Sequence, residues 1–152
     1  MRLSAKADYA LRAAAELAAA AGEGPVKGER IAAAQEIPPK FLENILIALR
    51  HAGLVDSRRG ADGGYRLARP ASEIALADVI RAVDGPLVSV YGLRPEAVEY
   101  NETATVLQHV WIAARRSLRD VFEQVSIQQL ADGRLPKAVT SRTADEDAWQ
   151  PH

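Results

Sequence analysis

Two adjacent prolines, Pro38 and Pro39, constrain the fold of this 152-residue chain more than any other feature. Neither can donate a helical backbone hydrogen bond, so a helix that starts near Lys27 must end at about Gln35. Proline is well tolerated in the first turn of a helix, so the same pair also predicts the start of another helix, which ends at Gly53. The apolar residues of this second helix recur at helical spacing: Phe41, Leu42, Ile45, Leu46 and Leu49. We therefore expect two helices joined by a very short turn.

The segments around this pair predict the rest of a small domain. Residues 4–21 form an alanine-rich helix with Ser4 as its N-cap and Gly22 at its end. Residues 54–58 and 65–67 favour strands, and the glycine-rich segment 59–64 between them predicts a hairpin. A fourth helix over residues 76–83 closes at Gly85, although its N-cap, Ala75, caps poorly and predicts a frayed start. Helix, turn, helix and hairpin is the order of a winged helix-turn-helix, so the fold class is mainly α with a small β-hairpin wing.

A long helix is predicted from about Glu102 to Glu123. At 1.5 Å per residue it is on the order of 30 Å long, which exceeds what the preceding domain can cover by itself. We therefore expect a second copy of the chain to bury its apolar stripe and to form a homodimer. The candidate dimerisation residues are Val106, Leu107, Val110, Trp111, Ala114, Leu118, Val121 and Phe122.

The chain is accordingly expected to have four parts. Residues 1–85 form the winged helix-turn-helix domain, with the wing at about 54–69, and residues 86–103 form a short strand or an irregular connection. Residues 104–135 hold the dimerisation helix and a short terminal helix, which begins with the capping box of Ser126 and Gln129. Residues 136–152 are polar, show no period and are expected to be a disordered tail.

Charge is unevenly distributed along the chain. The whole chain has a formal charge of -1, but residues 1–69 carry 11 Lys+Arg and 8 Asp+Glu, whereas residues 70–152 carry 8 and 12. The positive half is the candidate DNA-reading half, which suits a phosphate-backbone partner such as double-stranded DNA. No window approaches about 18 uninterrupted apolar residues, and the apolar start contains charges unlike those of a signal peptide. We expect a cytoplasmic protein with no membrane partner.

Two segments carry the residues suited to DNA. A helix that enters the major groove needs short side chains and exposed polar groups at its N-terminus. Lys40 can reach phosphate and Glu43 or Asn44 can reach base edges, although a surface carboxylate near the positive helix end explains Glu43 equally well. Arg58 and Arg59 precede the hairpin tip and can insert a guanidinium into a minor groove. The candidate DNA-binding residues are Pro39, Lys40, Glu43, Asn44, Arg58, Arg59, Gly60 and Tyr65.

Several motifs together resemble the Rrf-type winged-helix regulators, the family of IscR, NsrR and CymR. They are MRLSAKADYALR at 1–12, IA at 31–32, FLE at 41–43, LRHAGLV at 49–55, RGADGGY at 59–65 and ADVIRAVDGP at 77–86. The similarity extends over residues 1 to about 132. It implies a homodimeric bacterial transcription regulator whose third helix reads a palindromic operator and whose wing arginine, here Arg59, enters the minor groove.

One departure from the family bears on the signal. Many members bind an iron-sulfur cluster through three cysteines placed before the long helix, whereas residues 92–103 contain none and the whole chain has no cysteine. We therefore expect no cofactor and no metal site, and identify the chain as a cysteine-free member. Asp8 matches an aspartate that supplies a ligand in some members, but without thiolates we interpret it as an exposed helix carboxylate.

The sequence thus predicts a dimeric DNA-binding transcription regulator, a repressor more than an activator, that binds a palindromic operator. The alternative is a winged-helix protein-interaction module that docks a partner protein such as a metabolic enzyme. The effector is unknown and can be a small molecule or a protein; Trp111 and Tyr100 could line a pocket for it, although such aromatic residues are more often core. No catalytic triad or phosphate-binding loop occurs, so we do not expect an enzyme.

Overall fold

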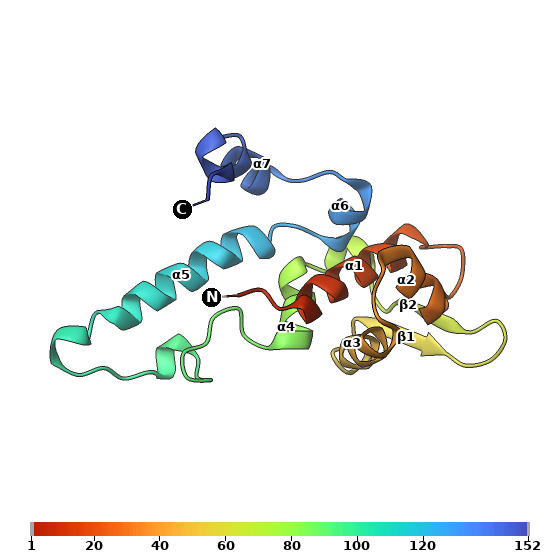
Figure 1. Cartoon of the computed structure of the whole chain (residues 1–152), viewed down its shortest axis with the longest axis horizontal. Helices are drawn as coiled ribbons and strands as arrows, with labels where there is room; N and C mark the ends of the chain where they lie inside the picture. The colour runs from red at the N-terminus through yellow and green to blue at the C-terminus, as the bar shows by residue number, and fades with distance from the viewer. Residues whose placement is uncertain (1, 152) are drawn as a thin grey trace.

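The computed structural model, which describes residues 2–151, is mostly helical with one two-stranded antiparallel hairpin (Figure 1). The predicted fold class is therefore confirmed. The N-terminal domain contains α1 (Ala5–Ala19), α2 (Gly28–Gln35), α3 (Pro39–His51), β1 (Val55–Arg58), β2 (Gly64–Leu67) and α4 (Leu76–Asp84), with a 3-10 turn at Ala71–Glu73. It is followed by α5 (Leu107–Phe122), α6 (Ile127–Asp132) and α7 (Lys137–Thr143). In Figure 1, α5 projects from this domain on the side opposite to the hairpin.

The helix-turn-helix follows from the proline pair and from one left-handed residue. Glu36 ends α2 with φ 52 and ψ 41, and the N–H of Ile37 donates to the carbonyl of Ala32 at 3.0 Å. The chain then turns through Pro38 into α3, which starts at Pro39 because proline needs no helical donor there. Ile37 is buried, so the turn itself is held in the core.

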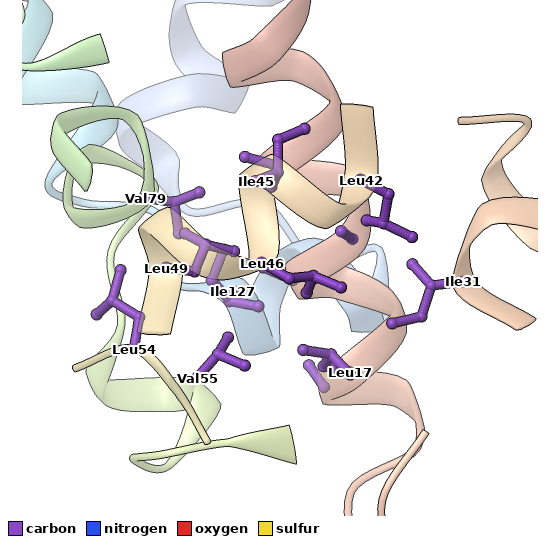
Figure 2. Packing of buried hydrophobic residues seen from close by; sticks show 14 of the residues in the cluster. Leu17, Ile31, Leu42, Ile45, Leu46, Leu49, Leu54, Val55, Val79 and Ile127 are labelled. Atoms are coloured by element: carbon purple, nitrogen blue, oxygen red, sulfur yellow. The ribbon is translucent and has the colours of Figure 1, made fainter. Parts of the chain in front are cut away.

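A core of aliphatic residues packs α1, α2 and α3 against α4 and the hairpin. Figure 2 shows part of this core, in which α6 contributes Ile127 from beyond the long helix. The fully buried face of α3 consists of Leu42, Ile45, Leu46 and Leu49. Because these residues fix the rotation of α3 about its axis, they also decide which of its polar residues point outward.

The start of α4 differs from the frayed end that Ala75 predicts. The Asp78 carboxylate accepts the backbone N–H of Ala75 at 2.9 Å, so a residue inside the helix caps it. Capping by an N3 acid satisfies one of the free donors of the first turn even when the N-cap side chain is apolar.

The long helix is shorter than its sequence predicts. A 3-10 turn at Glu102–Ala104 precedes it, Glu102 has φ 46, and α5 begins only at Leu107 with no side-chain cap. Before it, residues 86–103 form an irregular connection with an isolated bridge between Val90 and Leu93 and a 3-10 turn at Pro95–Ala97. After it, the Ser126 hydroxyl accepts the N–H of Gln129 at 3.1 Å and starts α6 as expected.

The tail also differs from the expected disorder. Residues 137–143 form α7, and a 3-10 turn follows at Glu146–Trp149. None of these residues is buried; the segment is held by local bonds, such as that from the Trp149 indole N–H to the carbonyl of Thr143 at 2.9 Å. Hydrophobic periodicity misses such a segment because its folding uses local hydrogen bonds and little apolar burial. Within residues 2–151, no helix has the length and apolar character needed to cross a membrane.

Candidate nucleic-acid interface and dimerisation surface

The outward face of α3 is polar near its N-terminus and carries most of the predicted contact residues. Lys40, Glu43 and Asn44 are all exposed, and Pro39 is exposed at the first helical position. Lys40 and Asn44 lie opposite the buried face, whereas Glu43 lies on the flank that faces the wing. The folded helix therefore presents the Lys40 ammonium and the Asn44 amide to a partner with no change in its backbone or core packing.

The N-terminus of α3 has free backbone donors. Its N-cap is Pro38, no side chain forms a cap hydrogen bond there, and no acidic residue lies in the first turn. The first-turn N–H groups and the positive end of the helix dipole are therefore open to an anion such as a DNA phosphate. Lys40 adds a full positive charge beside them.

Ile47 belongs to the same face, although it is missing from the predicted site. Its side chain is 40% exposed, three residues after Asn44 and seven after Lys40 on the helix. An exposed apolar group at this spacing suits contact with a thymine methyl group in a major groove. The sequence signal was present in this spacing, but an isoleucine in an apolar-rich helix is more readily assigned to the core.

The wing separates the two predicted arginines. In the register Val55 pairs with Leu67 and Asp56 with Arg66, so Arg58 shares the outer face of the hairpin with Asp56. Ser57 points the other way, because its hydroxyl accepts from Arg50 of α3 at 3.1 Å. Arg59 lies beyond the strand, at the exposed start of the tip. Arg59 is therefore the arginine that the tip itself presents.

The tip keeps a shape that only glycine permits. Gly60 has φ 105, and its carbonyl accepts the N–H of Gly63 at 3.0 Å. A Cβ on Gly63 would lie 2.1 Å from the carbonyl oxygen of Arg58, which backbone atoms cannot tolerate. The glycines thus fix the tight turn that carries Arg59, and Gly60 contributes backbone conformation and no side chain.

Tyr65 holds the wing in place. It is half-buried, and its backbone exchanges two hydrogen bonds of 2.8 Å with Val26, just before α2. Its ring lies against Gly28, with Cε2 3.7 Å from where a Cβ would be. Gly64, Tyr65, Pro39 and Glu43 line the same groove of about 410 Å³ between the wing and α3. The structure therefore places Tyr65 at the base of the wing, where it positions the tip.

Lys27 is a second positioning residue that sequence reasoning missed. Its ammonium donates to the carbonyl of Gly60 at 3.0 Å, which ties the start of α2 to the wing tip. A lysine at a helix N-cap gives no signal for such a contact, because its partner lies 33 residues away in the chain. Together with Tyr65, it fixes the distance between α3 and Arg59.

The predicted dimerisation stripe is left largely uncovered in the single chain. No residue of α5 is buried, and Val106 and Val110 are 69% and 54% exposed. Val106 is the N-cap residue of α5 and lies outside its regular turns. Leu107, Trp111, Ala114, Leu118, Val121 and Phe122 are half-buried. Phe122 reaches the core at the end of α5, so the part of the stripe with the least cover is its start, at Val106 and Val110.

Trp111 and Tyr100 are in direct contact. The indole N–H of Trp111 donates to the Tyr100 hydroxyl at 2.9 Å, and the Gln108 amide donates to the carbonyl of Val98 at 2.9 Å. These bonds fasten the connection to one side of α5. The side with Val106 and Val110 is left free, and that side is the surface that a second copy would bury.

Comparison with known proteins identifies the family. Residues 3–133 match Rrf2, described as an iron-dependent transcriptional regulator. The chain belongs to the Rrf2 family. This match covers the winged helix-turn-helix domain, the connection, α5 and α6, and so includes both candidate surfaces.

Individual relatives agree with this assignment. The Rrf2 chain is 48% identical over 150 residues to Rv1287 of Mycobacterium tuberculosis, named as a candidate HTH-type transcriptional regulator, with 99% of this chain and 93% of the relative covered. The solved structure of CymR, the global cysteine regulator of Bacillus subtilis, is 34% identical with a TM-score of 0.73, covering 88% of this chain and 98% of that one. T. potens IscR is 30% identical with a TM-score of 0.70, covering 99% and 97%. These relatives are named as regulators and none as an enzyme, so this Rrf2 member is a transcription regulator.

The iron in the family description does not fit the residues present. An iron-sulfur cluster needs thiolate ligands, and the chain has no cysteine. Nor does the part of the chain that the structure describes bring together three or more His, Asp or Glu side chains that could hold a metal ion. Asp8 forms an ion pair with Arg12, with Oδ2 3.0 Å from Nε. The residues present therefore do not support sensing through an iron-sulfur cluster held by this chain.

Proposed function

We propose that this Rrf2 regulator is a homodimeric repressor that binds a palindromic operator in double-stranded DNA. One observation carries the proposal: the uncapped N-terminus of α3, with Lys40 and Asn44 exposed on its outer face, adjoins the wing across one groove, and Arg59 is exposed at the tip of that wing. Backbone donors and cations bind phosphate, and side chains on the outer helix face read bases. A regulator of this kind acts on the chromosome, and thus in the bacterial cytoplasm.

Each residue of this face has a separate role in the proposal. Lys40 and the first-turn N–H groups of α3 bind backbone phosphates and set the register of the helix in the major groove. Asn44 and Glu43 hydrogen-bond base edges, and Ile47 contacts an apolar group beside them. Arg59 enters the adjacent minor groove, while Arg58, on the outer face of the hairpin, contacts the flanking phosphates.

The exposed stripe of α5 supports the dimer. Burying Val106 and Val110 against a second copy removes from water an apolar face that the single chain leaves open. A two-fold dimer presents two α3 helices to two half-sites about one helical turn apart, which is why the operator is proposed to be palindromic. Once one α3 helix is bound, the second binds its half-site as an intramolecular step, so the binding free energies of the two half-sites combine.

The signal is proposed to be a small molecule or a partner protein. A ligand can change operator affinity only when it binds one arrangement of the two DNA-reading domains more tightly than another. The junction between the N-terminal domain and α5 is the place where such a ligand could act, because it sets the angle between these domains.

Reconstitution with iron and sulfide tests whether the signal is independent of an iron-sulfur cluster. We expect the purified protein to stay colourless after anaerobic incubation with both and desalting, because no thiolate is present to hold a cluster. Visible absorption and iron analysis measure the result, and an IscR that binds a cluster serves as the positive control. A stable absorption band with stoichiometric iron and sulfide would contradict it and would make Asp8 and His109 candidate ligands.

Capture of genomic DNA tests the function as a whole. Immobilised full-length protein is mixed with sheared DNA from its own organism, and the bound fragments are sequenced. We expect a small set of promoter fragments that share an inverted repeat with half-sites about one helical turn apart. Uniform recovery of all fragments would instead favour the protein-interaction module, in which helices and wing dock a partner protein.

A further inference from the structure

A second charged site lies away from the DNA-binding face, at the junction of α4 and α5. A cavity of about 440 Å³ opens there, and its lining consists of Arg81, Gly85, Pro86, Leu87, Arg94, Arg115 and Arg119. The four arginines come from the end of α4, from the connection and from α5. No acidic residue lines this cavity.

The surrounding carboxylates are too few to occupy these arginines. Glu123 accepts from Nη2 of Arg81 at 2.5 Å and from Nε of Arg119 at 2.9 Å, so one carboxylate serves two guanidinium groups. Glu96 pairs with Arg115. Within residues 2–151, Arg94 forms no ion pair and is only attracted by the nearby Glu96. A guanidinium group has five N–H donors, so most donors of the cluster still face the cavity or water.

The other acidic residues nearby leave this excess in place. Asp78 lies 4.0 Å from Arg81, at the limit of an ion pair, and its other oxygen accepts the N–H of Ala75. Asp120 pairs with Arg116, which is exposed and lies outside the cavity. Arg81 and Arg119 thus share Glu123, and Arg115 pairs with Glu96. Asp78 and Asp120 add only weaker attraction to Arg81 and Arg119.

The charge of the cluster is constant near neutral pH. Hydrogen bonds from Arg119 and Arg81 lower the pKa of Glu123, and its own backbone N–H together with Arg115 lowers the pKa of Glu96. Both carboxyls are thus ionised, and arginine does not deprotonate in proteins. A ligand for this cavity must supply the missing negative charge itself.

We propose that this cavity binds a small anion with two or more negative charges, a phosphorylated or polycarboxylate metabolite. Arginine forks bind phosphate and carboxylate oxygens in pairs, and four of them converge here with unused donors. The volume admits anions from inorganic phosphate to citrate. Helix pairing alone explains Arg81, Arg115 and Arg119, each of which has a carboxylate, but it leaves Arg94 and the surplus charge without a role.

The position of the cavity indicates what binding would do. Arg81 belongs to α4 of the DNA-reading domain, whereas Arg115 and Arg119 belong to α5. An anion that bridges them holds the domain at one angle to the dimerisation helix, and so favours one spacing of the two DNA-reading domains. This regulatory step, unlike the binding itself, rests on the proposed function.

Direct titration of the full-length protein without DNA tests the binding. Inorganic phosphate and citrate are titrated by calorimetry at fixed ionic strength, and we expect a Kd below about 1 mM for at least one of them. Tighter phosphate binding indicates a phosphorylated ligand, and tighter citrate binding a polycarboxylate. Arg94→Ala should weaken binding about tenfold, the typical loss for one charge-assisted hydrogen bond. Its matched control is Arg116→Ala, on the same side of the molecule but outside the cavity, which should bind like the wild type.

A variant with the opposite effect separates a binding site from a purely structural cluster. Glu123→Gln removes the carboxylate that competes for Arg81 and Arg119, so anion affinity should rise several-fold even though an ion pair between α4 and α5 is lost. A structural cluster predicts no gain. Circular dichroism checks that each variant is folded.

Three results would overturn the proposal. The first is the absence of measurable binding of either anion up to about ten times the expected Kd. The second is equal weakening of anion binding by Arg94→Ala and Arg116→Ala. The third is weaker operator binding by Arg94→Ala with no anion present, which would assign the cluster to the DNA interface. Operator affinity is then measured with and without saturating anion. An unchanged affinity would overturn the regulatory step alone, whereas loss of operator binding in every sample would contradict the proposed function and leave the anion site standing.

Discussion

The Val110→Asp variant is expected to be a monomer at micromolar concentration and to lose tight operator binding. Val110 lies in the first turn of α5, on the exposed part of the apolar stripe, and is 54% exposed in the single chain, so the change should leave the fold of each protomer intact. In a dimer the aspartate would be an unpaired charge removed from water, which costs several kcal/mol. Light scattering after size-exclusion chromatography measures the mass, and fluorescence anisotropy with operator DNA measures the affinity.

The neighbouring residue provides the control. His109 is exposed on the same helix but lies off the stripe, so His109→Asp adds the same charge and should stay dimeric. Two results would refute the role of the stripe: a dimeric Val110→Asp variant, or a wild-type protein that is already monomeric at micromolar concentration.

The Arg59→Ala variant is expected to weaken operator binding by about 1 to 3 kcal/mol, roughly 5- to 150-fold, with the dimer intact. Arg59 is exposed at the wing tip, so its removal disturbs nothing in the free protein. In the complex its guanidinium would sit in a narrow minor groove, where the negative potential is strong. Anisotropy titrations at one fixed salt concentration measure the change, because salt alone shifts such affinities.

Arg66→Ala is the matched control for the wing. Arg66 is also an exposed arginine of the hairpin, but it faces Asp56 across the strands with Nη2 3.6 Å from Oδ2. A surface pair of this kind contributes little to stability, so we expect an affinity within about twofold of the wild type. Equal losses in the two variants would mean that the wing acts through its net charge, and an unchanged Arg59→Ala variant would remove Arg59 from the interface.

The sequence predicts local features that nearby residues decide. Pro38 and Pro39 cannot donate helical hydrogen bonds, and α2 ends at Gln35 and α3 starts at Pro39 accordingly. The capping box of Ser126 and Gln129 starts α6 in the same way. Local bonding also explains two differences: the Asp78 carboxylate caps α4, and hydroxyl and indole bonds order the tail, both without any hydrophobic period.

The sequence proposes a DNA-binding site at the level of segments, and this remains a prediction. It singles out the third helix and the glycine-rich hairpin because residue type and spacing are visible along the chain. Strand register then separates Arg58 from Arg59, and the contacts with Val26 and Gly28 show Tyr65 as a support of the wing. A one-residue change of register would exchange the two faces of the hairpin, so sequence alone does not assign them.

By itself the sequence determined the turn between α2 and α3, that the fold is a winged helix-turn-helix, and that no thiolate is available for a cluster, because each depends on neighbouring residues or on composition. It did not determine the start of α5 or the presence of α7. Only the tertiary structure decided which distant residues meet. Lys27 reaches the wing tip 33 residues away, and Arg81, Arg94 and Arg119 gather around one cavity from separate segments. The pairing of Val26 with Tyr65 beside α2 sets the first contact, and the angle at which α5 leaves the core sets the second. Both result from packing across the whole domain, which no local pattern in the chain encodes.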